Sequence, residues 1–181
     1  MMEYNKAKLI ADTLRAELLP FCNVLEIAGA LRRRDSEVAD IEFVAIPRFE
    51  VRETGQRQLD GMDVVVRYNI LFEWLNENQP VVMGGTRYVG WCVLDLGEIR
   101  ASIFTAEIAT WGYLFLARTG PLEFMHNVIG RLRNTGIMPR AAGAGLQNSA
   151  GVQIAVPSEG AVFEMCGAEY VVPWERGGAG L

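Results

Sequence analysis

The 181-residue sequence has only three cysteines and one histidine, and this scarcity excludes several kinds of site. Cys22, Cys92 and Cys166 are odd in number and far apart, so they form neither a disulfide framework nor a CxxC zinc site. We expect all three to be small buried hydrophobic residues in a reducing compartment. The single histidine, His126, cannot make a metal site by itself.

Long apolar runs and an excess of positive charge are also missing. No apolar run approaches the roughly 20 residues that cross a bilayer. The N-terminal segment carries early acidic residues and no long apolar stretch, unlike a secretory signal. We therefore expect a cytoplasmic protein with no membrane partner. Lys and Arg number 17 against 22 Asp and Glu, a net charge of −5, so any nucleic-acid contact must use a local basic patch.

Apolar residues make up 50% of the chain, enough for a buried core, and their spacing predicts both helices and strands. The expected helices cover residues 4–19, 106–117, 122–134 and 158–167. The expected strands cover residues 22–30, 38–46 and 152–156, with up to three more within 80–104. Residues 64–78 predict a strand followed by a short helix, and the polar residues 48–62 predict a loop.

A break at Thr119-Gly120-Pro121 divides the chain into two parts. The part before it holds most of the expected strands, and the part after it mixes helices with short strands. We expect an α/β fold, with a mixed β-sheet domain over residues 1–117 and a smaller α+β lobe over residues 118–176. The Gly-rich residues 177–181 are expected to be a disordered tail.

The stretch from Gly29 to Phe43 carries the clearest chemical pattern. A strand ends at Gly29, a polar turn with three consecutive arginines follows, and a second strand begins with Asp40 and Glu42. Residues two apart on a strand point to the same face, so the two carboxylates project together. Such a pair repels unless a cation lies between its members, and Mg²⁺ suits oxygen ligands and phosphates.

A glycine turn also lets backbone N–H groups approach a phosphate closely. Together with the arginines, Gly29 and the carboxylate pair predict a site for a metal–triphosphate. The plainer interpretation stays open, because acidic pairs on strands and runs of arginine are commonly solvated surface.

The order G-x-x-R-R followed by D-x-E resembles the nucleotidyltransferase signature of family X DNA polymerases, the polymerase beta type. Two further stretches resemble the same family in order and spacing, SIFTAEIATWGYLFLARTG at 102–120 and SEGAVFEMCGAEYVVPWER at 158–176. The resemblance spans residues 22–176 and is to the compact viral or phage members, which hold a palm and one further lobe. For such a member the cytoplasm could be that of a phage-infected host.

The resemblance implies a nucleotidyltransferase palm, a thumb- or fingers-like C-terminal lobe and a gap-filling activity of the repair type. That activity adds dNMP from a dNTP to the 3′-hydroxyl of primed or gapped DNA with Mg²⁺ or Mn²⁺, and we expect a monomer. It implies metal binding and catalysis by Asp40 and Glu42. It implies nucleotide binding by Gly29, Ala30, Arg33, Thr119 and Gly120, although Ala30 replaces a serine that would donate to the triphosphate.

One position departs from the family pattern. Ser102 stands where the family has a third catalytic carboxylate that binds the second metal and activates the 3′-hydroxyl. A serine is a poor ligand and a poorer base, so we expect weakened catalysis, unless Asp95 or Glu98 substitutes. The alternative is a catalytically degenerate relative that binds nucleotide or DNA. Transfer of a nucleotide to a small molecule or a protein is a third, weaker interpretation.

Residues 118–140 carry a local excess of positive charge. Four arginines against one glutamate give this segment a net charge of +3 on an acidic chain. We expect either a contact with the DNA backbone or a solvated helix face. The candidate DNA-binding residues are Arg118, Arg131, Arg133 and Arg140.

Overall fold

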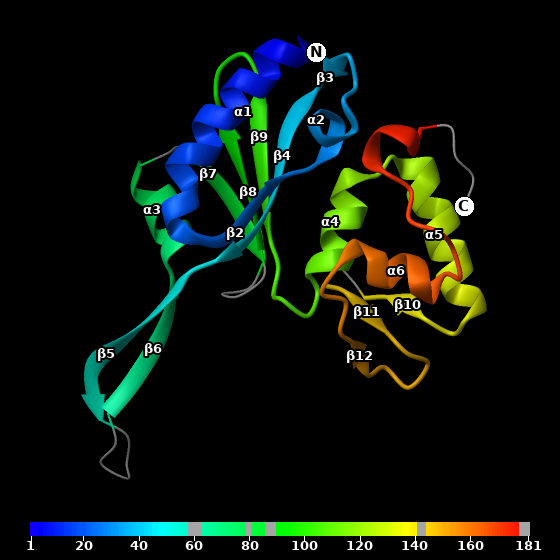
Figure 1. The fold of residues 1–181 in the computed structure, drawn as a ribbon. Coiled ribbons are helices and arrows are strands. Elements are labelled where there is room, and N and C mark those ends of the chain that lie inside the picture. The colour runs from blue at the N-terminus through cyan, green and yellow to red at the C-terminus, as the bar shows by residue number, and fades with distance from the viewer. Residues whose placement is uncertain (58–62, 79–80, 86–89, 141–143, 178–181) are drawn as a thin grey trace.

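The computed structural model describes residues 1–57, 63–78, 81–85, 90–140 and 144–177. It has a mixed α/β fold, with a sheet and its helices in the first part of the chain and a helical C-terminal lobe beside them (Figure 1). Within these residues, no helix combines the length and apolar character needed to cross a membrane. Residues 178–181, the end of the expected tail, lie outside the described part.

The central sheet has five strands in the order β2-β4-β9-β8-β7. Strands β4 and β9 are parallel, and every other neighbouring pair is antiparallel. Their bounds are β2 Cys22–Ile27, β4 Asp40–Pro47, β7 Val81–Gly85, β8 Gly90–Asp95 and β9 Arg100–Thr105. The strands expected over 38–46 and within 80–104 are therefore confirmed among the described residues.

Helix α1 (Tyr4–Leu18) covers one face of this sheet (Figure 1). Its apolar stripe, which includes Ala7, Leu14 and Leu18, packs against Ile41 and Phe43 of β4 in one core. The side chain of Glu3 caps the first turn, and the 3₁₀ turn η1 (Leu19–Phe21) with Pro20 follows the last. The spacing of leucines and alanines on α1 therefore gives the helix an apolar side, which covers one face of the sheet.

Helix α4 (Trp111–Thr119) packs on the opposite face of the sheet. Leu114 joins Val44 and Ala28 in a small buried cluster there. The helix begins later than the expected 106–117, because the Thr110 hydroxyl and the backbone of Glu107 form a turn that holds the chain out of the helix. Thr119, at the end of α4, is followed by Gly120 at φ +59°, a conformation that glycine adopts easily.

The C-terminal lobe has its own core. Phe124, Val128 and Leu132 of α5 (Leu122–Asn134) pack against Phe163 of α6 (Glu159–Met165) and Leu116 of α4. Helix α5 matches the expected 122–134, and α6 lies within the expected 158–167. Three two-residue strands and the 3₁₀ turn η3 complete the lobe; they are β10 Met138–Pro139, β11 Leu146–Gln147, β12 Gln153–Ile154 and η3 Pro173–Glu175.

Three expectations about local structure are wrong. The expected strand 22–30 ends at Ile27, and a short helix α2 (Gly29–Arg33) replaces the turn because Ala, Leu and Arg favour helix. The expected strand 152–156 is only β12, since Val156 leaves that sheet to accept a bond from Gly112 on α4. Cys166 is half-buried, whereas Cys22 and Cys92 are buried as expected.

The largest difference is in the segment 48–62, which the polar composition predicts to be a loop and of which residues 58–62 lie outside the described part. There the chain forms strand β5 (Phe49–Arg57), paired with β6 (Asp63–Asn69) in a hairpin that extends away from the sheet (Figure 1). Arginines stack on aromatic rings along it, Arg67 on Phe49 and Arg52 on Tyr68. Helix α3 (Ile70–Asn78) follows β6 as expected, and β3 (Glu37–Val38) pairs with β1 (Met2–Glu3).

Candidate functional site

Asp40 and Glu42 lie on the face of β4 that is turned away from α1. Ile41 and Phe43, which alternate with them, are fully buried in the first core, whereas both carboxylates are only half-buried. The two acidic side chains therefore share one face, as the spacing predicts. The neighbouring strand β9 sets Ser102 beside Glu42 and Arg100 beside Asp40.

The carboxylate pair has no partner of opposite charge in contact. Neither Asp40 nor Glu42 makes an ion pair or a side-chain hydrogen bond with any residue in the described ranges. Burial, and then the negative charge of Asp40, raise the pKa of Glu42 to about 7, against the opposing effect of Arg118 and Arg33. Two adjacent carboxylates under this electrostatic strain would be stabilised by a cation.

The donor set fits Mg²⁺ or Mn²⁺ bound together with phosphate. Among the described residues, no group of three or more His, Cys, Asp or Glu side chains could hold a metal. Mg²⁺ is commonly held by only one or two carboxylates, with substrate phosphates and water completing its octahedron. Asp40 and Glu42 are sufficient protein ligands for that arrangement and are insufficient for an all-protein metal cage.

A cavity of about 340 Å³ opens beside Glu42, between β4 and helices α4 and α5. Its lining includes the charged residues Arg33, Arg118 and Glu42, and also Tyr113, Ala117 and Met125. Guanidinium groups bind phosphate oxygens, and apolar lining residues suit a flat apolar group such as a base. The lining thus combines the two kinds of residue that bind the two parts of a nucleotide.

Gly29 packs directly against Glu42. It has φ +60°, and a Cβ placed on it would lie 2.2 Å from Oε2 of Glu42. A glycine is needed here both for the backbone conformation and for the close approach. The residue next to it, Ala30, packs against the first core instead and does not line the cavity.

Arg33, Thr119 and Gly120 come together across the gap between α2 and α4. Arg33 donates through Nη1 to the carbonyl oxygen of Thr119 and through Nη2 to the carboxylate of Asp35. Its Nη1 lies 3.7 Å from the position a Cβ would take on Gly120, and both residues line the cavity. The structure therefore brings together four of the five expected nucleotide-binding residues.

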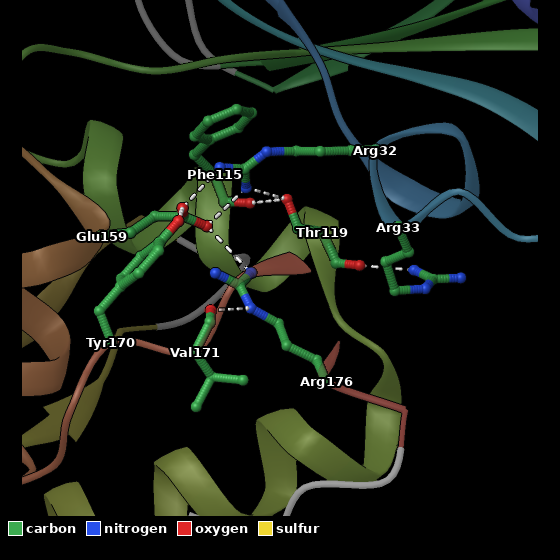
Figure 2. A network of polar contacts seen from close by, with 8 residues as sticks. All are labelled: Arg32, Arg33, Phe115, Thr119, Glu159, Tyr170, Val171 and Arg176. Atoms are coloured by element: carbon green, nitrogen blue, oxygen red, sulfur yellow. Dashed lines mark hydrogen bonds and ion pairs between the residues drawn. The ribbon is translucent and has the colours of Figure 1, made fainter. Parts of the chain in front are cut away.

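A buried ion-pair network holds this arrangement in place (Figure 2). Arg32 donates to both oxygens of Glu159, at 2.7 and 2.6 Å, and also to the hydroxyl of Thr119 at 2.7 Å. Arg176 and Tyr170 donate to the same carboxylate at 3.1 and 3.0 Å. Because Arg32 precedes Arg33 on α2, the network fixes the helix that carries Arg33 to the C-terminal lobe.

The sequence reading gave no role to Arg32, Glu159, Tyr170 or Arg176. Three of them stand in the segment SEGAVFEMCGAEYVVPWER, where an acid, a tyrosine and an arginine recur in the family pattern. The spacing of these three residues in the sequence could have singled them out, but spacing alone does not show that their side chains meet. Burial of Glu159 and Arg176, at 7% and 1% exposure, marks the cluster as structural.

The network makes stability depend on pH through Glu159. Burial raises the pKa of this carboxyl, but the hydrogen bonds from Arg32 and Arg176 outweigh burial and leave the pKa below its ordinary 4.5. A group with a lowered folded-state pKa stabilises the protein above its unfolded pKa and loses that contribution as pH falls through the folded value.

We therefore expect Glu159→Gln to be less stable than the wild type at neutral pH, with a difference that narrows as pH falls below about 4.5. Urea unfolding at a series of pH values measures this. Glu26→Gln, which breaks only the exposed pair with Arg15, is the control and should follow the wild-type curve. A difference that stays constant with pH would contradict the assignment.

The four arginines expected to contact DNA do not form one surface. Arg118 lies in the cavity, with its guanidinium 3.5 Å above the ring of Phe104. Arg131 and Arg133 are two residues apart on α5 and so face different directions. Arg140 is bonded to the side chain of Gln153 at the short strands. The charge excess of this segment is dispersed.

Neither acid near Ser102 replaces the missing carboxylate. Glu98 forms an ion pair with Lys6 of α1 at the surface. Asp95 pairs in register with Arg100, two strands away from Asp40, and its Oδ1 accepts from the N–H of Gly97 in the turn. Asp95 therefore stands two strand spacings, about 10 Å, from Asp40, with Arg100 between them.

No protein-family model matches this chain, and a search of curated proteins finds no similar sequence.

Proposed function

We propose that this chain is a nucleotidyltransferase of the polymerase beta type, which binds the triphosphate of a dNTP together with Mg²⁺ or Mn²⁺ at Asp40 and Glu42. The observation that carries the proposal is the half-buried carboxylate pair, which has no contact partner among the described residues and of which Glu42 lines a cavity together with Arg33. In this assignment residues 1–117 correspond to the palm. Residues 118–176 correspond to the smaller lobe, with α4 crossing the boundary.

Each residue of the proposed nucleotide site has a role that follows from its chemistry. Asp40 and Glu42 would hold the cation, which when bound would neutralise charge on the triphosphate. Arg33, tethered by Thr119 and Asp35, donates its remaining N–H groups to phosphate oxygens. Gly29 and Gly120 keep side chains out of the path of the phosphates and sugar. The acceptor we propose is the 3′-hydroxyl of primed or gapped DNA.

A second candidate is a relative that binds nucleotide or DNA without catalysis. Ser102 favours it, because the acceptor side of the site lacks a carboxylate and neither Asp95 nor Glu98 supplies one. In that case binding of the metal–triphosphate survives and transfer does not. In its nucleotide-binding form, this second candidate uses the same nucleotide site as the first and differs from it only in turnover.

Thermal unfolding with dATP and Mg²⁺ or Mn²⁺ tests the nucleotide site that both candidates need. A ligand that binds only the folded chain at a hundred times its Kd stabilises it by about 2.7 kcal/mol. We expect a clear rise in Tm for the wild type and for Glu98→Gln, whose carboxylate is exposed and paired with Lys6 of α1. Asp40→Asn should lose the rise. No shift in the wild type at millimolar nucleotide would refute the site.

A further inference from the structure

Arg118 is the one charged residue of the cavity to which the proposed function gives no role. It lines the cavity with Glu42, and its guanidinium carbon stacks 3.5 Å from the centroid of the Phe104 ring. Its Nε is buried and donates to no acceptor within the described ranges. Packing on an aromatic face, and not an ion pair, therefore positions this guanidinium.

The carboxylates that act on Arg118 are Glu42 and Asp40. Burial lowers the pKa of the Arg118 guanidinium, and these two carboxylates oppose that effect. Arg118 in turn acts to lower the pKa of Glu42. An arginine keeps its proton at any physiological pH. The carboxylate pair therefore faces a permanent positive charge that is close enough to interact and forms no contact ion pair with it.

Arg118 stacks on the face of β9 that also carries Ser102. Phe104, on which it stacks, follows Ser102 by two residues on β9, so both side chains share one face. Ser102 lies beside Glu42 in the β4–β9 ladder. A second divalent cation at that position would find no anionic side chain of its own and would meet the guanidinium charge.

We propose that Arg118 supplies the positive charge that a second metal ion supplies in two-metal sites, so that the chain binds a triphosphate with one divalent cation only. The inference rests on the proposed function, because it needs a cation–triphosphate at Asp40 and Glu42. The inference accounts for both Ser102 and Arg118. Where the guanidinium of Arg118 already supplies positive charge, a carboxylate at position 102 to bind a second metal ion is not needed.

Electron paramagnetic resonance of Mn²⁺ bound with dATP, in the absence of DNA, tests this directly. Two Mn²⁺ ions in a shared site lie about 3.5–4 Å apart, and their spins couple, whereas a single ion gives an uncoupled spectrum. We expect the uncoupled spectrum from the wild type. We also expect it from Ser102→Asp, because the new carboxylate would pair with Arg118.

The double variant Ser102→Asp, Arg118→Met should bind a second Mn²⁺ at least about tenfold more tightly than either the wild type or Ser102→Asp and show the coupled signal. Methionine keeps an apolar stem against Phe104, and Arg118→Gln is a second neutral replacement should the first fail to fold. Ser102→Asp with Arg133→Met removes an exposed arginine of α5 instead and should stay uncoupled.

A coupled signal from the wild type would overturn the inference, as would equal second-site affinity in Ser102→Asp and the double variant. Binding of one Mn²⁺ that Asp40→Asn abolishes would leave the proposed nucleotide site intact in either case. If the wild type binds no Mn²⁺ with dATP, the proposed function fails, and the single-cation site fails with it.

Discussion

Single-nucleotide extension of a gapped DNA duplex should be at least about 10³-fold slower with Asp40→Asn than with the wild type, a loss of about 4 kcal/mol of transition-state stabilisation. Asp40 belongs to the carboxylate pair on the face of β4 that is turned away from α1, and asparagine removes its charge while keeping its size. The wild type itself should be slow and faster with Mn²⁺ than with Mg²⁺, since Ser102 provides no third carboxylate.

Glu98→Gln is the control for this experiment, because its carboxylate pairs with Lys6 at the surface and should not affect the rate. A wild-type rate that survives Asp40→Asn would place the chemistry elsewhere in the chain. A wild type as inactive as Asp40→Asn, yet stabilised by dATP and metal, would favour the second candidate, a relative that binds without turnover.

Gly29→Ala should weaken binding of dATP with Mn²⁺ at least about 100-fold. The added Cβ would lie 2.2 Å from Oε2 of Glu42, so this carboxylate would have to leave its place beside Asp40. Gly97→Ala is the matched control. Both glycines have positive φ, at +60° and +82°, but the space around Gly97 is open.

Both alanine variants should lose about 1–2 kcal/mol of stability from the left-handed backbone alone. Only Gly29→Ala should also lose the nucleotide. Isothermal titration with dATP and Mn²⁺, together with urea unfolding, separates the two effects. Equal affinity in the two variants would show that Glu42 does not hold the cation.

The carboxylate face of the site was predictable from the sequence because it depends on local geometry. Alternation along a strand places Asp40 and Glu42 together and buries Ile41 and Phe43 whatever the rest of the fold does. Helix 122–134 was predictable for a similar reason, since its apolar spacing and its start after Pro121 are both local signals.

The remainder of the site depends on contacts between distant segments, which spacing does not encode. Arg118 was expected at a DNA surface from its charge, and only the packing of α4 on β9 shows that it stacks on Phe104 inside the cavity. Glu159 and Arg32 are 127 residues apart, and the ion pair between them appears only when α6 reaches α2. Strand β5 was missed because the polar composition of residues 48–62 predicts a loop, whereas its partner β6 was expected.

Anomalous diffraction from crystals of the wild type grown with Mn²⁺ and dATP shows directly whether Asp40 and Glu42 hold the cation. We expect one manganese peak within about 2–2.3 Å of oxygens from both Asp40 and Glu42, close to the coordination distances of Mg²⁺. We also expect triphosphate density that extends from this peak toward Arg33, in the cavity beside Arg118. A nucleotide bound elsewhere, or no manganese between the two carboxylates, would contradict the proposed cation–triphosphate site.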